Sequence, residues 1–179
     1  EFAANLKLSD VPADVIGRAK SIILDGLGCG LFGANVKWTQ ILSRVVKRLE
    51  PDGGHASIWG SGESASAVSA ALLNGTMIQG YELDDVNPAS IHSCAAVLPA
   101  VMAAAECIGP DKVNGERLLT AIIAGFEVGP RVGLCMNGNK MLVKGWHTPG
   151  IFGPFPAAVG AGRVLGLNSD QLYQALGIA

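Results

Sequence analysis

The sequence has little charge, few aromatic residues and no closely paired cysteines. Charged residues make up 16% of its 179 residues and aromatic residues 6%, whereas hydrophobic residues make up 49%. Disordered chains are rich in charge and poor in apolar residues, so this composition predicts a packed core instead. The net charge is −2, and the largest basic cluster is Arg44, Lys47 and Arg48, so no nucleic-acid partner is expected.

The four cysteines stand far apart: Cys29, Cys94, Cys107 and Cys135. The absence of a CxxC pair argues against a zinc ribbon and against a small secreted domain held by disulfides, so a reducing compartment is the simpler location. Because Cys29, Cys107 and Cys135 lie in apolar segments, we interpret them as small core residues. No cysteine is predicted to act as a nucleophile.

Long apolar runs are also missing. The charge-free stretches 64–81 and 149–162 contain Ser, Asn, Gln, Gly or Pro, and they fall short of the roughly 20 apolar residues of a membrane-spanning helix. The start, 1–4, has neither the basic region nor the hydrophobic core of a signal peptide. We therefore expect no membrane partner and a cytoplasmic location, or the mitochondrial matrix in a eukaryote.

What the sequence does have is helical periodicity. Apolar or small residues recur every three or four positions over 15–30, after Pro12, and again over 38–49. The second of these segments is expected to bury one apolar face: Ile41, Leu42, Val45, Val46 and Leu49. The stretch 56–59 is compatible with an extended conformation, but its shortness favours connecting structure.

Small residues dominate four further segments: 66–80, 95–105, 118–132 and 156–165. Ala, Gly and Ser at helical spacing allow two backbones to approach closely, which is typical of the interior helices of a bundle. The predicted fold class is therefore all-α, with one helical domain over 1–179.

Local signals mark helix ends and one ion pair. Asn114 is expected to cap a helix that begins at Gly115, and Glu127 and Arg131 have the spacing of a modest ion pair within that helix. The segment 168–173 has a capping signature and opens another helix shortly before the sequence ends. We expect the chain to stop inside a larger architecture.

Residues suited to acid–base chemistry gather at the junction 81–94. Within eleven residues it holds three carboxylates and one imidazole: Glu82, Asp84, Asp85 and His92. The helix that follows offers free N–H donors to an anion, and histidine exchanges protons near neutral pH. The alternative from spacing alone is that the acidic residues and Asn87 cap helices or form Asx turns, while His92 packs as an ordinary structural side chain.

A second junction, 144–150, places His147 in a loop constrained by Gly and Pro just before another small-residue helix. Lys140 and Lys144 could attract a carboxylate there, but isolated lysines near a loop also commonly face solvent. By itself this junction leaves both interpretations open.

Taken in order, these motifs resemble those of the MmgE/PrpD family. The resemblance covers nearly the whole chain and rests on an opening helix, an Asn-Gly helix, the acidic motif and two histidine segments. In that order they lie at 12–33, at 71–76, at 82–85, at His92 with 97–100, and at 145–148 with 157–158 and 165–167. Family activities include 2-methylcitrate dehydratase, cis-aconitate decarboxylase and iminodisuccinate epimerase, which work beside a carboxylate without a metal.

The resemblance implies a lyase acting by acid–base chemistry on a small di- or tricarboxylate, with no cofactor. It further implies a large helical domain, which this chain represents, a smaller α/β domain, which it lacks, and a homodimer. The family site carries over to four expected catalytic residues: His92, His147, Asp84 and Asp85. Glu82 and Lys144 are expected to contact the substrate. Glu82 and Val86 stand where cis-aconitate decarboxylase has Asp and Thr, so substrate contacts are expected to differ.

Other functions remain open at this stage. A metallohydrolase would use His55, His92 and His147 with Asp84 or Asp85, but no HExxH or similar ligand spacing occurs, so no metal is expected. A helical interaction module without catalysis would also fit the small-residue helices. A truncated, inactive product would fit the ending of the sequence just after a helix begins.

Overall fold

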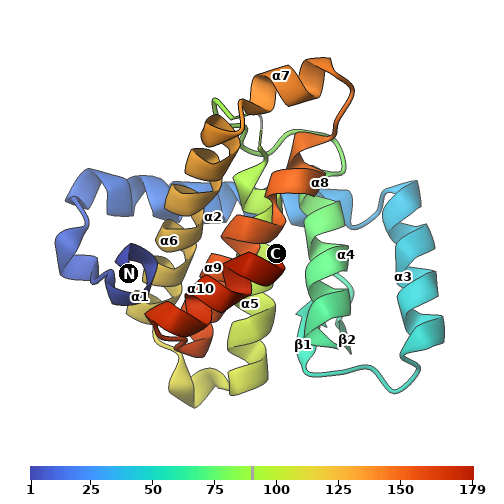
Figure 1. The fold of residues 1–179 in the computed structure, drawn as a ribbon. Helices are drawn as coiled ribbons and strands as arrows, with labels where there is room; N and C mark the ends of the chain where they lie inside the picture. Colours follow the sequence, from blue (N-terminus) through green and yellow to red (C-terminus); the bar gives the residue numbers. More distant parts are fainter. Residues whose placement is uncertain (90) are drawn as a thin grey trace.

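The computed structural model describes residues 1–89 and 91–179, and it confirms the all-α class (Figure 1). The helices are α1 (Phe2–Asn5), α2 (Ala13–Gly33), α3 (Lys37–Leu49), α4 (Ala67–Gln79), α5 (Ser93–Ile108), α6 (Gly115–Cys135), α7 (Gly138–Val143), α8 (Thr148–Phe152), α9 (Pro154–Leu165) and α10 (Ser169–Ile178). Two 3₁₀ turns, η1 (Leu8–Asp10) and η2 (Pro110–Lys112), and two short strands, β1 (Ala56–Ile58) and β2 (Glu63–Ala65), complete the described elements.

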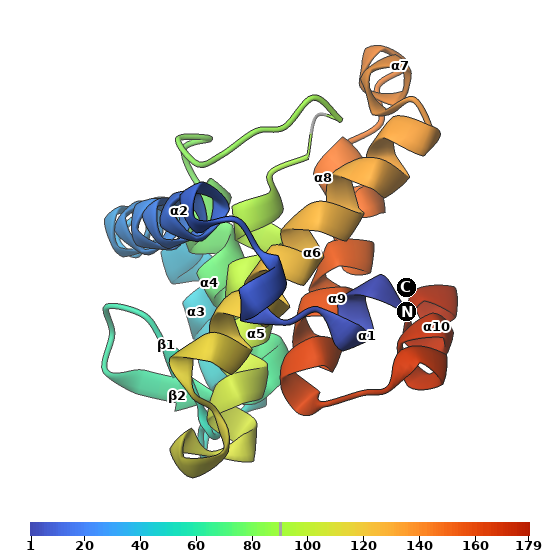
Figure 2. The same ribbon diagram turned by 90° about the vertical axis from the view of Figure 1, so that its left-hand side faces the viewer.

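Helix α5 forms the centre of the bundle. It packs against α4, α6 and α9, and α2 crosses both α4 and α5 (Figures 1 and 2). Val97 and Val101 of α5 are completely buried. A Cβ at Gly125 of α6 would stand 2.8 Å from Val97, and one at Gly160 of α9 would stand 2.7 Å from Val101. These small residues let the helices approach closely, as predicted for the interior of the bundle.

Helix α2 reaches α4 and α5 through glycines on its buried side. At Gly33 a Cβ would lie 2.0 Å from the carbonyl oxygen of Met77, and at Gly26 it would lie 2.2 Å from the Sγ of Cys94. Because Cys94 belongs to the first turn of α5, helix α2 supports the point where α5 begins.

The interpretation of 56–59 as connecting structure was wrong for Ala56–Ile58. These residues form β1, which pairs antiparallel with β2, with Ala56 opposite Ala65. Sequence periodicity does not reveal β1 because each strand of the hairpin has only three residues. The hairpin also depends on the buried side-chain amide of Asn74 on α4, which hydrogen-bonds to its backbone. Asn74 Oδ1 accepts from Trp59 N at 3.0 Å, and its Nδ2 donates to Ser57 O at 2.9 Å.

Substituting Asn74 with alanine should lower the free energy of unfolding by about 2 kcal/mol or more, because two backbone groups of the hairpin lose their partner. Urea denaturation would measure the loss. Asn35→Ala, at an exposed position, is the matched control and should stay within about 0.5 kcal/mol of the wild type. Equal stability of the two variants would contradict a structural role for the Asn74 amide.

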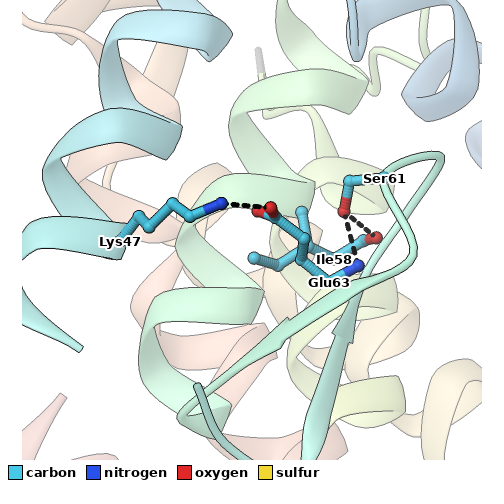
Figure 3. Close-up of polar contacts among 4 residues, drawn as sticks. All are labelled: Lys47, Ile58, Ser61 and Glu63. Carbon is cyan, nitrogen blue, oxygen red and sulfur yellow. Dashed lines mark hydrogen bonds and ion pairs between the residues drawn. The ribbon is translucent and has the colours of Figure 1, made fainter. Parts of the chain in front are cut away.

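Helix α3 is tied to the hairpin by its polar side. Figure 3 shows Lys47 reaching Glu63, with 2.5 Å between Nζ and Oε1, while the Ser61 hydroxyl donates to Ile58 O within the turn.

The predicted apolar face of helix α3 is buried only in part. Leu42 and Val46 pack toward the hairpin, whereas three residues are 46–74% exposed: Ile41, Val45 and Leu49.

The predicted helix caps are confirmed. Asn114 accepts from Arg117 N at 2.9 Å, and Asn168 and Gln171 form a reciprocal capping box at the start of α10. The predicted ion pair between Glu127 and Arg131 is also present. These features were predictable because each depends on residues within one helical turn.

The cysteine interpretation needs correction. Cys29 is half-buried, but Cys107 and Cys135 are exposed, so these two are not core residues. Each lies in the last turn of its helix, and apolar periodicity does not reveal which turns of a helix the neighbouring helices cover.

Helix α6 is long and apolar enough to cross a membrane by length and composition, with 21 residues and a mean hydropathy of 1.5. A buried core helix of a soluble protein can meet the same criterion. In this structure α6 packs against α5 and α9. The expectation of no membrane partner stays a prediction.

Candidate functional site

The acidic loop joins the end of α4 to the start of α5. Glu82 occupies the left-handed region with φ of +52°, where the chain turns away from α4. Asn87 then forms the Asx turn considered from the sequence, since its Oδ1 accepts from Ala89 N at 2.9 Å. Its Nδ2 donates to the hydroxyl of Ser93 at 2.9 Å, which fastens the loop to the first residue of α5.

Asp85 anchors the same helix end. Its Oδ1 accepts from the backbone N–H of Cys94 at 2.7 Å, so it satisfies a donor that the helix itself leaves free. Burial raises the pKa of Asp85, and the Cys94 N–H opposes that shift. This contact is the helix-capping role considered from the sequence, and the catalytic role of Asp85 stays a prediction.

Asp84 and His92 form a carboxylate–imidazole pair. His92 Nδ1 lies 3.0 Å from Asp84 Oδ1; the Asp84 side chain is fully buried, and that of His92 is 14% exposed. The second carboxylate oxygen of Asp84 has no hydrogen-bond partner among residues 1–89 and 91–179. Burial raises the pKa of Asp84, while the nearby His92 imidazole opposes the shift.

This pairing determines the role of each ring nitrogen. When Asp84 is ionised and His92 neutral, the contact requires Nδ1–H to donate to the carboxylate, which fixes the tautomer. Nε2 is then the nitrogen that remains free to accept or deliver a proton. His92 precedes α5 directly, so its ring stands beside the positive end of that helix.

His92 opens onto a groove of about 410 Å³. The residues that line the groove belong to α4, α5, α8 and the start of α9, and Figure 1 shows where these helices lie in the fold. Its lining is mostly small and apolar, and among residues 1–89 and 91–179 its polar side chains come from four residues: Thr76, Gln79, His92 and His147.

The structure therefore brings both predicted histidines to one groove. His147 caps α8, and its carbonyl accepts from Gly150 N at 3.1 Å. A Cβ at Gly150 would come within 3.2 Å of the His147 ring, so glycine leaves room for the imidazole at the groove. Two junctions far apart in the sequence thus contribute residues to one groove.

Glu82 and Lys144 lie elsewhere. Both are exposed, Lys144 at the end of α7, and neither lines the groove. Their assignment as substrate-binding residues stays a prediction.

Two groove residues escaped sequence reasoning. Thr76 and Gln79 lie on the face of α4 that borders the groove, and Gln79 ends that helix just before the acidic loop. Their helical spacing looked like ordinary core periodicity. Cys94 is buried with its Sγ 3.7 Å from Ile22 O, and burial raises the pKa of its thiol, so it is no reactive thiolate at the groove.

The described parts of the chain contain no group of three metal-ligating side chains. His55, which a metallohydrolase would combine with His92 and His147, is exposed and does not line their groove.

Comparisons with known proteins place this geometry in context. A family model described as the MmgE/PrpD N-terminal domain matches residues 1–179. A cis-aconitate decarboxylase-like protein of Aspergillus oryzae is 42% identical over 183 residues, covering 99% of this chain and 38% of that protein. Cis-aconitate decarboxylase of Aspergillus terreus is 40% identical over 99% of this chain and 37% of its own length. The human cis-aconitate decarboxylase is 32% identical, over 97% and 36% respectively. The chain thus spans less than two fifths of these relatives.

Proposed function

Because this chain belongs to the MmgE/PrpD family, whose N-terminal domain it spans, we propose that the full-length protein is a lyase acting on a small polycarboxylic acid. Decarboxylation of cis-aconitate is the first reaction to test, since the relatives at 40–42% identity carry that name or are described as similar to it. The observation that carries the proposal is the groove that holds His147 and the His92–Asp84 pair.

His92 is the proposed acid–base group. When the bond between a carboxylate carbon and its neighbour breaks, carbon dioxide leaves and the bonding electrons remain as an enolate-like anion stabilised by the adjacent carboxyl group. The protonated imidazole then donates its Nε2 proton to carbon, and the neutral ring regains a proton from solvent. Asp84 holds the ring in place through its contact with Nδ1.

His147 lines the same groove, so we propose that it contacts the second polar end of the substrate or assists the proton transfer. The positive N-terminal end of α5 stabilises the negative charge that develops on the substrate beside His92. Asp85 contributes by fixing the first turn of α5.

Substrate carboxylates also need cationic partners. No Lys or Arg among the described residues lines the groove. We propose that cations from outside residues 1–179 bind these carboxylates, in addition to any contact with Lys144, since the relatives are more than twice as long. The 179 residues by themselves are then expected to turn over substrate poorly or not at all. A homodimer and the location expected from the sequence remain proposals of the same kind.

The direct test is turnover by the full-length protein of cis-aconitate, 2-methylcitrate and iminodisuccinate, with and without a chelator. Chelator-resistant turnover of any of them supports the proposal and names the reaction. A folded, full-length protein without turnover would favour the second candidate, an interaction module, for which the exposed Ile41, Val45 and Leu49 of α3 are the supporting observation. Activity lost on chelation would return weight to a metal site.

The raised pKa of Asp84 predicts a pH-dependent stability. The folded protein binds this proton more tightly than the unfolded chain, so the stabilisation is complete below the ordinary pKa of about 3.9 and is lost as the pH rises through the raised value. Asp84→Asn removes this titration. The free energy of unfolding of the variant minus that of the wild type should therefore increase from acidic to neutral pH, measured by urea denaturation at each pH. A difference that stays constant with pH would contradict the raised pKa.

A further inference from the structure

A second pocket lies at the other end of α9 from the groove. The groove contacts the start of this helix, at Gly153 and Ala157, whereas the second pocket contacts Arg163 and the following Gly166. Its volume is about 320 Å³. The N-terminal segment and the first turn of α6 complete it, and Figure 2 shows α1 beside α9 and α10 in this part of the fold.

Three cationic side chains line this pocket against one carboxylate. The cations are Lys7, Arg117 and Arg163, and the carboxylate is Glu116. In the described ranges 1–89 and 91–179, none of the three cations forms an ion pair. The protein has a net charge of −2, so this local excess of positive charge runs against its overall balance.

The two guanidinium groups are held in place by backbone carbonyls. Arg163 is half-buried and donates to Ala4 O and, at 2.6 Å, to Leu6 O. Arg117 donates to Lys112 O at 2.8 Å. These acceptors fix the orientation of the side chains without neutralising their charge. Each guanidinium has five N–H donors, so donors remain for a ligand.

The backbone around the pocket also favours a negatively charged ligand. The pocket includes Asn114 and Glu116 at the start of α6, and the N-terminus of this 21-residue helix is its positive end. A Cβ at Gly166 would come within 3.2 Å of Arg117 Nη2, so glycine there leaves space for the guanidinium at the pocket edge.

We propose that this pocket binds a small oxyanion carrying two or more negative charges, at a site separate from the groove. Guanidinium groups bind phosphate and carboxylate oxygens in the same paired geometry, so a phosphate and a polycarboxylate share the required chemistry. A multivalent anion matches three cations opposed by one carboxylate better than a singly charged one. Because the site joins the segment around Leu6 to α6 and α9, its ligand also fastens the N-terminal segment to the bundle.

The test is calorimetric titration of the full-length protein with inorganic phosphate and, separately, with citrate. Arg117→Gln and Lys7→Gln should each weaken binding about tenfold or more, because a charge-assisted hydrogen bond is lost. Arg48→Gln, an exposed cation on α3 outside the pocket, is the matched control and should leave affinity unchanged. Arg163 is left intact because it also holds Ala4 and Leu6.

A second variant separates this pocket from the groove. His92→Asn alters the groove alone, so binding in the pocket should persist in that variant. Binding of either anion with this pattern supports the proposal and identifies the ligand class. The proposal is overturned if neither anion binds, if the Arg117 and Lys7 variants bind as tightly as the Arg48 control, or if His92→Asn abolishes binding.

Discussion

Replacing His92 with asparagine in the full-length protein should lower kcat by about a hundredfold to ten-thousandfold, the contribution typical of a placed general acid or base. Asparagine keeps a polar group near Asp84 but cannot exchange a proton near neutral pH. The measurement is steady-state turnover of whichever polycarboxylate the wild type uses. Asparagine can still donate a hydrogen bond to the buried carboxylate of Asp84, so the variant is expected to fold while its activity falls.

His55→Asn is the matched control. His55 is exposed and outside the groove, so its loss should leave kcat within about twofold of the wild type. His147→Asn tests the second groove histidine in the same assay, and a loss of kcat comparable with that of His92→Asn would place both imidazoles in the reaction. Normal turnover by His92→Asn, with unchanged circular dichroism, would remove the acid–base assignment.

Substituting Gly33 with alanine should destabilise the fold by about 3 kcal/mol or more. The new Cβ would stand 2.0 Å from the carbonyl oxygen of Met77, a backbone atom that cannot rotate away. Helices α2 and α4 must then separate at their crossing. Urea denaturation gives the loss in free energy of unfolding, and a midpoint shift without a change in slope would indicate that the same folded state is being compared.

Gly17 offers a control in the same helix. A Cβ at Gly17 meets nothing within 4 Å, so Gly17→Ala gains helix propensity without a clash and should stabilise by about 0.5–1 kcal/mol. The free energy of unfolding should therefore fall in Gly33→Ala and rise in Gly17→Ala. If Gly33→Ala were also neutral or stabilising, the close crossing of α2 and α4 would be disproved.

The stability of α2 bears on the site because this helix supports the start of α5. Gly26 lets α2 approach Cys94, which lies two residues after His92. A change that displaces α2 would therefore move the first turn of α5, with the Asp85 and Asp84 contacts that depend on it. We expect Gly33→Ala to reduce turnover even where it remains folded.

Local features were predictable from the sequence, and long-range ones were not. The caps at Asn114 and Asn168 and the pair Glu127–Arg131 each involve residues within one helical turn, so residue type and spacing were sufficient. The hairpin was missed because β1 exists only through pairing with 63–65 and through the Asn74 amide.

The sequence by itself determined an all-α protein with small-residue interior helices, because 3.6-residue periodicity and abundant Ala and Gly admit few other solutions. It also placed Asp84 and His92 in one short loop, but their pairing is known only from the structure. Only the tertiary structure decided that His147 joins His92 at one groove, that Glu82 and Lys144 stand outside it, and that Asp85 caps a helix. The physical reason is that a side chain's partner depends on how α4, α5, α8 and α9 pack, and packing is a property of the whole chain.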